Sequence, residues 1–146
     1  MARGALATGA RWGEAEGLRA SQLRESAMDF TKTKLGKNRT VPIASGLAAL
    51  LRQRAEQGAD ALFGPSYQAF RDGVDRAKIE LPKGQMTHVL RHTFASHFMM
   101  DGGNILALQR ILRHSTLTMA MRYAHLSPDH LAEAASLNPL ARLTLG

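Results

Sequence analysis

The chain has 146 residues, with 19 lysines and arginines against 12 acidic residues and no cysteine. This length supports one globular domain with its own core, and 45% hydrophobic with 21% charged residues excludes a disordered tail. Without cysteine, a disulfide scaffold, a thiolate zinc site and a cysteine nucleophile are excluded. The first residues also carry charge too early for a signal peptide, so we expect a soluble, cytoplasmic protein.

The positive charge is concentrated in two stretches of the chain. Residues 1–40 and residues 83–125 each carry a net charge of +4, whereas residues 41–82 are neutral. If the two basic stretches meet in space, they form an electropositive face of the kind that binds a nucleic-acid backbone. A solvated surface with scattered cations is the alternative that charge alone leaves open.

The first third of the chain predicts a helix and a small sheet. Residues 14–20 can be helical, and residues 28–31 and 39–43 are candidate strands. The segment between the strands is rich in lysine and contains Gly36 and Asn38, which suit a turn. We therefore expect an antiparallel pair with a lysine-rich hairpin at its tip.

The remainder predicts helices. A one-sided stripe of leucines follows Ser45, a candidate N-cap. A helix after Thr87 is expected to bury residues 86, 90, 94 and 98, which are all apolar. Further helices are expected over 66–78 and 105–112. A short helix capped by Ser115 or Thr116 is expected to carry Tyr123, and a last helix should run from Ser127 to Asn138. The predicted fold class is mainly α with a small antiparallel β-sheet (α+β).

A cluster of polar residues opens the helix after Thr87. At 100° per residue, His88, Arg91 and His92 share one broad face of its first turn, where free backbone N–H groups favour an anion. A guanidinium can donate two parallel hydrogen bonds to a phosphate, and an imidazole can shuttle a proton. His92 and His97 could instead be partly buried, hydrogen-bonded histidines, and for His97 we favour that interpretation.

A metal site is the other interpretation of these histidines. His88 and His92 have the i, i+4 spacing of a zinc-binding pair, and His114 could be a third ligand. A zinc protease would have glutamate after the first histidine, where this chain has Val89, and Arg91 would repel a divalent cation. We therefore expect neither a metal nor another cofactor.

Four segments, in order, resemble the motifs of the tyrosine recombinases. They are TGARWGEAEGL (8–18), KLGKNRTVP (34–42), THVLRHTFASHF (87–98) and LRHSTLTMAMRYAH (112–125). Over residues 5–137 the chain is similar to the catalytic domain of a temperate-phage integrase. The resemblance implies a site-specific recombinase that cleaves and rejoins DNA strands through a 3′-phosphotyrosyl intermediate, without ATP or metal.

The resemblance also assigns roles to individual residues. Tyr123 matches the nucleophile, Lys34 the general acid for the departing 5′ oxygen, and His88 the histidine that helps to move the tyrosine proton. The groups expected to hold the non-bridging phosphate oxygens are Arg11, Arg91 and His114. The further residues expected to contact DNA are His92, Lys32, Lys37, Arg39, Arg113 and Arg122.

One position departs from the family pattern. Arg113 stands where the family usually has glycine before the active-site histidine. The replacement costs backbone freedom if this position needs a positive φ, and it adds a cation beside the site.

Two other functions are compatible with some of these sequence features. Residues 104–123 could form two helices joined by a tight turn, which suits a non-catalytic DNA-binding protein that retains the fold. A type IB topoisomerase would use similar chemistry. The six matched catalytic residues favour the recombinase.

The resemblance also implies partners and a domain organisation. Residues 1–146 match a catalytic domain without the N-terminal core-binding domain, so we expect reduced activity. The partners are double-stranded DNA attachment sites in the cytoplasm of a bacterial host. Residues 137–146 are largely apolar, with Arg142 as their one charged side chain. They could pack on a neighbouring protomer, forming a dimer or a tetramer on DNA, and a frayed terminus is the alternative.

Overall fold

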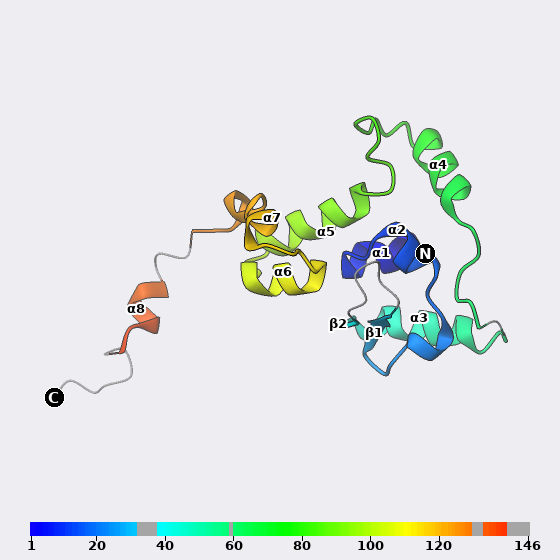
Figure 1. The fold of residues 1–146 in the computed structure, drawn as a ribbon, viewed down its shortest axis with the longest axis horizontal. Coiled ribbons are helices and arrows are strands. Elements are labelled where there is room, and N and C mark those ends of the chain that lie inside the picture. Colours follow the sequence, from blue (N-terminus) through cyan, green and yellow to red (C-terminus); the bar gives the residue numbers. More distant parts are fainter. Residues whose placement is uncertain (32–37, 59, 130–132, 140–146) are drawn as a thin grey trace.

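The computed structural model describes residues 1–31, 38–58, 60–129 and 133–139, which form a mainly helical protein with a small antiparallel sheet (Figure 1). This confirms the predicted fold class. No helix within these ranges is long and apolar enough to cross a membrane. The elements are α1 (Ala2–Thr8), α2 (Trp12–Glu16), η1 (Ala20–Gln22), β1 (Ala27–Phe30), β2 (Arg39–Pro42), α3 (Ser45–Ala55), α4 (Tyr67–Arg76), α5 (Val89–Met100), α6 (Ile105–Leu112), α7 (Leu117–Met121), η2 (Ala124–Leu126) and α8 (Ala134–Leu137).

The sheet consists of β1 and β2, paired antiparallel with Met28 opposite Val41 and Phe30 opposite Arg39. Alternate side chains of each strand are buried, as expected for a sheet with one face on a core. This first core also includes Leu18, Leu51 and Leu62. The predicted lysine-rich tip, residues 32–37, lies outside the described residues.

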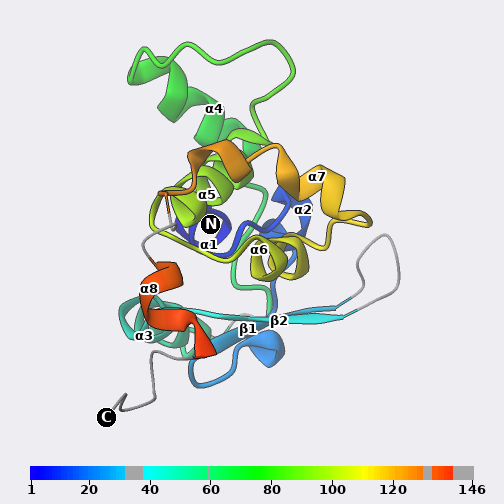
Figure 2. The same cartoon turned by 90° about the vertical axis from the view of Figure 1, so that its left-hand side faces the viewer.

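Helix α5 connects the two halves of the molecule. Helix α1 packs against α5, and α6 and η2 also contact it (Figures 1 and 2). A second core lies where α5 packs against α6 and η2, and it consists of Ala95, Met99, Leu108, Leu112 and Tyr123. Helix α5 thereby holds α6 and η2 on one side and α1 on the other.

The buried side of α5 differs from the prediction. Its buried residues are Arg91, Ala95 and Met99, whereas Leu90, Phe94 and Phe98 are half-buried. Helix α5 is covered by both α1 and α6, so the buried stripe of α5 faces both of these helices. The stripe is shifted by one residue from the predicted positions 90, 94 and 98. His97 is exposed, so the expectation of a partly buried histidine there is wrong.

Several helix ends also differ. Helix α1 was not predicted, Ala44 rather than Ser45 is the N-cap of α3, and Tyr123 lies after α7 as the N-cap of η2. Ser127 ends η2, and residues 127–129 are not helical, so the predicted helix start at Ser127–Pro128 is wrong. Local sequence signals locate most of the helices but do not fix their ends, because tertiary packing decides how far each helix continues.

Candidate active site

The turn between α1 and α2 approaches α5 and α6 closely. Gly9 caps α1 in the left-handed conformation, with φ of 62°. A Cβ atom at this position would lie 2.5 Å from Cδ2 of Leu112 and 2.6 Å from Cδ1 of Phe94. Both the backbone conformation and the space therefore require glycine here.

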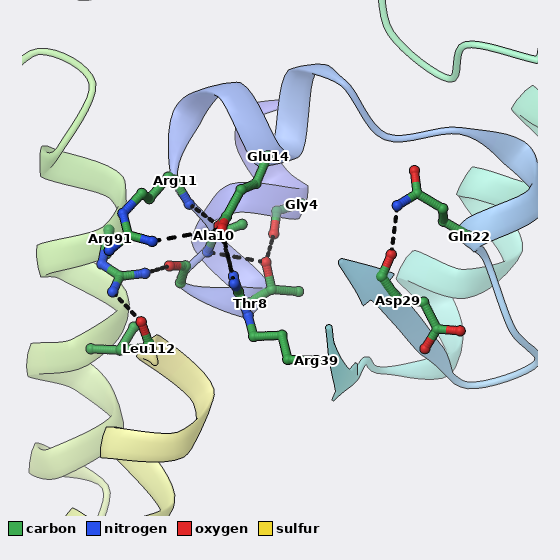
Figure 3. Close-up of polar contacts among 11 residues, drawn as sticks. Gly4, Thr8, Ala10, Arg11, Glu14, Gln22, Asp29, Arg39, Arg91 and Leu112 are labelled. Atoms are coloured by element: carbon green, nitrogen blue, oxygen red, sulfur yellow. Dashed lines mark hydrogen bonds and ion pairs between the residues drawn. The ribbon is translucent and has the colours of Figure 1, made fainter. Parts of the chain in front are cut away.

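The next residue with a predicted role, Arg11, is the N-cap of α2. Its backbone N–H donates to Oε2 of Glu14 at 2.9 Å, and its Nη1 lies 3.7 Å from Oε1 of the same carboxylate. The Arg11 side chain is 42% exposed and extends toward Arg91 (Figure 3). Glu14 thus fixes the start of the helix, where an acidic group also complements the helix dipole.

Arg39, a predicted DNA contact, has an internal partner. It donates from Nη1 and Nη2 to the two carboxylate oxygens of Glu14 at 3.0 and 2.9 Å, and its guanidinium lies 4.5 Å from the centre of the Phe30 ring. Burial raises the pKa of Glu14, but the hydrogen bonds from Arg39 and the Arg11 amide outweigh burial, so the pKa is lowered. Arg39 therefore joins β2 to α2, and its side chain is only 6% exposed.

Arg91 is buried beneath the turn between α1 and α2. Its Nη1 donates to the carbonyl oxygen of Gly9 at 2.7 Å, and its Nη2 donates to the carbonyl oxygen of Leu112 (Figure 3). Burial and then the charges of Arg11 and Arg39 lower the pKa of Arg91 to about 10, so the guanidinium is still protonated at neutral pH. Arg91 joins the first, third and fourth sequence motifs at one point.

Tyr123, the predicted nucleophile, lies against α5. It is 7% exposed, and its hydroxyl is 2.5 Å from Nδ1 of His92. Burial raises the pKa of Tyr123, and the charges of Arg122 and Arg91 partly oppose this effect. The phenol is therefore protonated at neutral pH and needs an acceptor for its proton before it can act as a nucleophile.

His114 follows α6 and lies among several cations. Burial, followed by the charges of Arg91, Arg11 and Arg122, lowers the pKa of His114 to about 4. Its Nδ1 atom is buried, with no hydrogen-bond partner among the described residues. The imidazole is neutral at pH 7, and its environment favours a negatively charged ligand that could offset the surrounding charges.

His88 lies at the edge of this cluster. It is the N-cap of α5 and is exposed, and its ring centre is 6.4 Å from that of His92. Among the described residues, no group of three or more histidine, aspartate or glutamate side chains is placed to hold a metal ion. His88 is therefore open to a ligand from solvent, while His92 is already engaged with Tyr123.

A pocket of about 610 Å³, lined by residues with polar or charged side chains, lies beside His114, between the start of β2 and the end of α6. Arg113 has φ of 52° and ψ of 47°, so the position where the family usually has glycine does adopt the left-handed conformation. Sequence reasoning missed the contribution of Arg110, which faces the same pocket three residues earlier on α6. The lining residues are Asn38, Arg39, Gln109, Arg110, Arg113, His114 and Ser115.

The structure thus brings most of the predicted residues to one region. The charges of Arg91, Arg11, Arg122 and His92 all act on the pKa of His114, and the charges of Arg122 and Arg91 act on the pKa of Tyr123, so these six residues lie in one region. Lys32, Lys34 and Lys37 lie outside the described residues. Sequence reasoning also missed the roles of Gly9 and Glu14, although both belong to the first motif.

Comparison with known proteins identifies relatives over nearly the whole chain. The phage integrase family matches residues 1–130. The integrase of Escherichia phage 186 is 58% identical over 139 residues, covering 95% of this chain and 40% of that protein. The tyrosine recombinase XerD of Corynebacterium glutamicum is 32% identical over a matched region that covers 86% of this chain and 47% of that protein. The chain therefore spans less than half the length of these relatives.

Solved structures agree with these matches. The catalytic domain of bacteriophage HP1 integrase has a TM-score of 0.88 at 56% identity, covering 97% of this chain and 82% of that one. The XerA recombinase has a TM-score of 0.68 at 29% identity, covering 90% of this chain and 54% of that one. The sequence and structural matches together show that the chain belongs to the phage integrase family of tyrosine recombinases.

Proposed function

We propose that the chain cleaves and rejoins DNA strands, with Tyr123 attacking a phosphodiester to form a 3′-phosphotyrosyl link. The observation that carries this proposal is the position of the Tyr123 hydroxyl in a region that also holds Arg91, Arg11 and His114. Attack on phosphorus adds negative charge to the non-bridging oxygens. Cationic and N–H donors already held in place stabilise that charge, and one such donor contributes about 3–4 kcal/mol in the transition state.

The proposed roles follow from where each group lies. Arg11 is partly exposed and can reach a phosphate, whereas Arg91 already donates to two backbone carbonyls and has further N–H groups for the ligand. His114 would donate one hydrogen bond, and Lys34 would protonate the departing 5′ oxygen. The bond energy is retained in the phosphotyrosyl link, so rejoining requires no ATP.

We test the proposal with a suicide substrate, a duplex nicked close to the scissile phosphate so that the cleaved fragment diffuses away. The wild-type chain should form a protein–DNA adduct that survives denaturation, and Tyr123→Phe should form none. Tyr67→Phe is the matched control, because Tyr67 lies 44% exposed on α4 and should leave adduct formation unchanged. An adduct of equal yield with Tyr123→Phe would refute the proposed chemistry.

The proposed partner is double-stranded DNA carrying an attachment site. Arg110 and Arg113 line the pocket beside His114, the charge of Arg122 acts on the same histidine, and residues 83–125 carry a net charge of +4. A chain that contacts only one side of the duplex should bind weakly and lose affinity steeply as salt rises. We therefore propose strand cleavage at reduced activity, and poor complete recombination, for these 146 residues tested on their own.

We also propose that the C-terminal segment joins one protomer to the next on DNA. Helix α8 lies far from α3 and α4 (Figure 1), none of its residues is buried, and Leu137 is 71% exposed. Apolar side chains in such a position gain stability when a second surface covers them. Removing residues 134–146, which include α8 and Leu137, should shift DNA-bound oligomers toward monomer in analytical ultracentrifugation, and an unchanged distribution would contradict this role.

A non-catalytic DNA-binding protein is the second candidate function. Helices α6 and α7 pack against each other with a short turn between them, as such a binder would require. High salt separates the two functions, since it dissolves a non-covalent complex and leaves a phosphotyrosyl adduct intact.

A further inference from the structure

The second histidine of the HVLRH segment contacts the proposed nucleophile, whereas the first does not. Nδ1 of His92 is 2.5 Å from the Tyr123 hydroxyl, and the two ring centres are 6.1 Å apart. His88 is exposed one turn earlier on α5. The family resemblance assigns the transfer of the Tyr123 proton to His88 and a DNA contact to His92. In the structure, however, the hydroxyl of Tyr123 contacts His92.

We infer that His92 is the group that takes the proton from Tyr123 during attack on DNA, an inference that rests on the proposed function. A neutral imidazole with its proton on Nε2 presents the Nδ1 lone pair to the hydroxyl. As the Tyr123 oxygen bonds to phosphorus, its O–H bond breaks and the proton moves to Nδ1. The departing 5′ oxygen keeps the electrons of the broken P–O bond and takes its proton from the group proposed as general acid, Lys34.

The environment of His92 keeps its imidazole able to accept a proton. Burial, followed by the charges of Arg122, His88 and Arg91, lowers the pKa of His92, and His114 lies in the same cluster. The neutral form therefore dominates at physiological pH. The imidazolium formed during attack is repelled by these cations, but the negative charge developing on the phosphorus oxygens attracts it.

In the return reaction the same pair works in reverse. When a DNA 5′-hydroxyl attacks the phosphotyrosyl bond, the imidazolium of His92 returns the proton to the departing phenolate oxygen. His92 therefore acts as a base in cleavage and as an acid in rejoining, which microscopic reversibility requires of one group in this position. A residue that only contacts DNA would not do this.

A substrate with sulfur in place of the bridging 5′ oxygen isolates this step, because a thiolate leaves without a general acid. We measure single-turnover adduct formation on the suicide substrate with this change, between pH 5 and pH 9, for wild type and His92→Asn. The asparagine can still accept a hydrogen bond but does not titrate in this range. His97→Asn is the control, since His97 is an exposed histidine on the same helix outside the site.

For the wild type, we expect a rate that falls on the acid side with an apparent pKa below 6.5, where His92 becomes protonated. His92→Asn should be slower by about 10²–10⁴-fold at pH 7.5 and should lack this acid limb, with unchanged affinity for DNA. His97→Asn should match the wild type in rate and pH profile.

Three outcomes would overturn the inference while leaving the proposed function intact. They are a wild-type rate in His92→Asn, an acid limb that persists in this variant, and a loss of DNA affinity with an unchanged cleavage rate. The last outcome would support the role predicted from the sequence, in which His92 contacts DNA. A wild-type chain that forms no adduct on either substrate would overturn the proposed function and this inference together.

Discussion

Arg91 donates a hydrogen bond to the carbonyl oxygen of Gly9, 82 residues earlier in the chain, at 2.7 Å. A second donor of the same guanidinium binds the carbonyl oxygen of Leu112 at the end of α6. One buried cation therefore fixes the α1–α2 turn relative to the segment that leads to His114 and Tyr123. The proposed phosphate-binding groups keep their spacing because this arginine connects the segments that carry them.

Gly9→Ala should damage this connection. The new methyl group would overlap Leu112 and Phe94 on a backbone already at positive φ, so we expect a loss of about 2–4 kcal/mol in the free energy of unfolding. Urea denaturation measures the loss. Gly13→Ala is the control, since a Cβ atom there meets nothing within 4 Å, and it should change stability by less than about 1 kcal/mol. Equal stability of the two variants would show that the approach at Gly9 is not tight.

The pair formed by Glu14 and Arg39 should be a major source of stability. Glu14→Gln removes the charge that Arg39 faces in a largely buried position, so we expect a loss of about 3 kcal/mol. The free energy of unfolding from urea titration provides the test. Asp75→Asn breaks an exposed ion pair with Arg71 and should cost less than about 0.5 kcal/mol.

The same pair predicts a dependence on pH. Because the pKa of Glu14 is lowered in the folded protein, its stabilising effect is complete above the unfolded pKa and is lost as pH falls through the folded pKa. The difference in stability between wild type and Glu14→Gln should therefore be constant near neutral pH and should shrink below about pH 4.5. A difference that stays constant down to pH 3 would contradict the assignment.

Arg113→Gly should separate stability from DNA affinity. Arg113 and Lys78 both have left-handed backbones, with φ of 52° and 53°, so glycine at either position should relieve about 0.5–1 kcal/mol of backbone strain. Only Arg113→Gly should weaken DNA binding and reduce the slope of log Kd against log salt by about 1. Lys78→Gly is thus a control for the backbone effect, and equal salt slopes in the two variants would contradict a phosphate contact by Arg113.

His114 should change its protonation when DNA binds. In the free protein we expect an NMR titration with a pKa of about 4, because burial and the neighbouring arginines disfavour the imidazolium. A phosphate next to the ring would favour it and raise the pKa by about one unit or more. DNA with a neutral methylphosphonate at the scissile position should produce no such rise. A pKa near 6.5 in the free protein would contradict the buried, cationic environment.

The sequence by itself determined the fold class and most of the predicted site. Turn residues around Gly36, apolar spacing in the C-terminal half and four ordered motifs are local features that are visible without coordinates. The resemblance of these motifs to the tyrosine recombinases is what assigned Tyr123 and Arg91 to one site, because spacing within a motif does not determine which motifs meet in space. The local features could not fix helix ends or the buried side of α5, which depend on the elements that pack against that helix.

Only the tertiary structure decided which polar groups are paired. Arg39 and His92 each look like a DNA contact in the sequence, but the fold brings Glu14 to the first and Tyr123 to the second. The partners lie 25 and 31 residues away, and no local pattern encodes such a distance. A hydrogen bond requires atoms within about 3 Å, so its existence depends on how whole helices and strands pack.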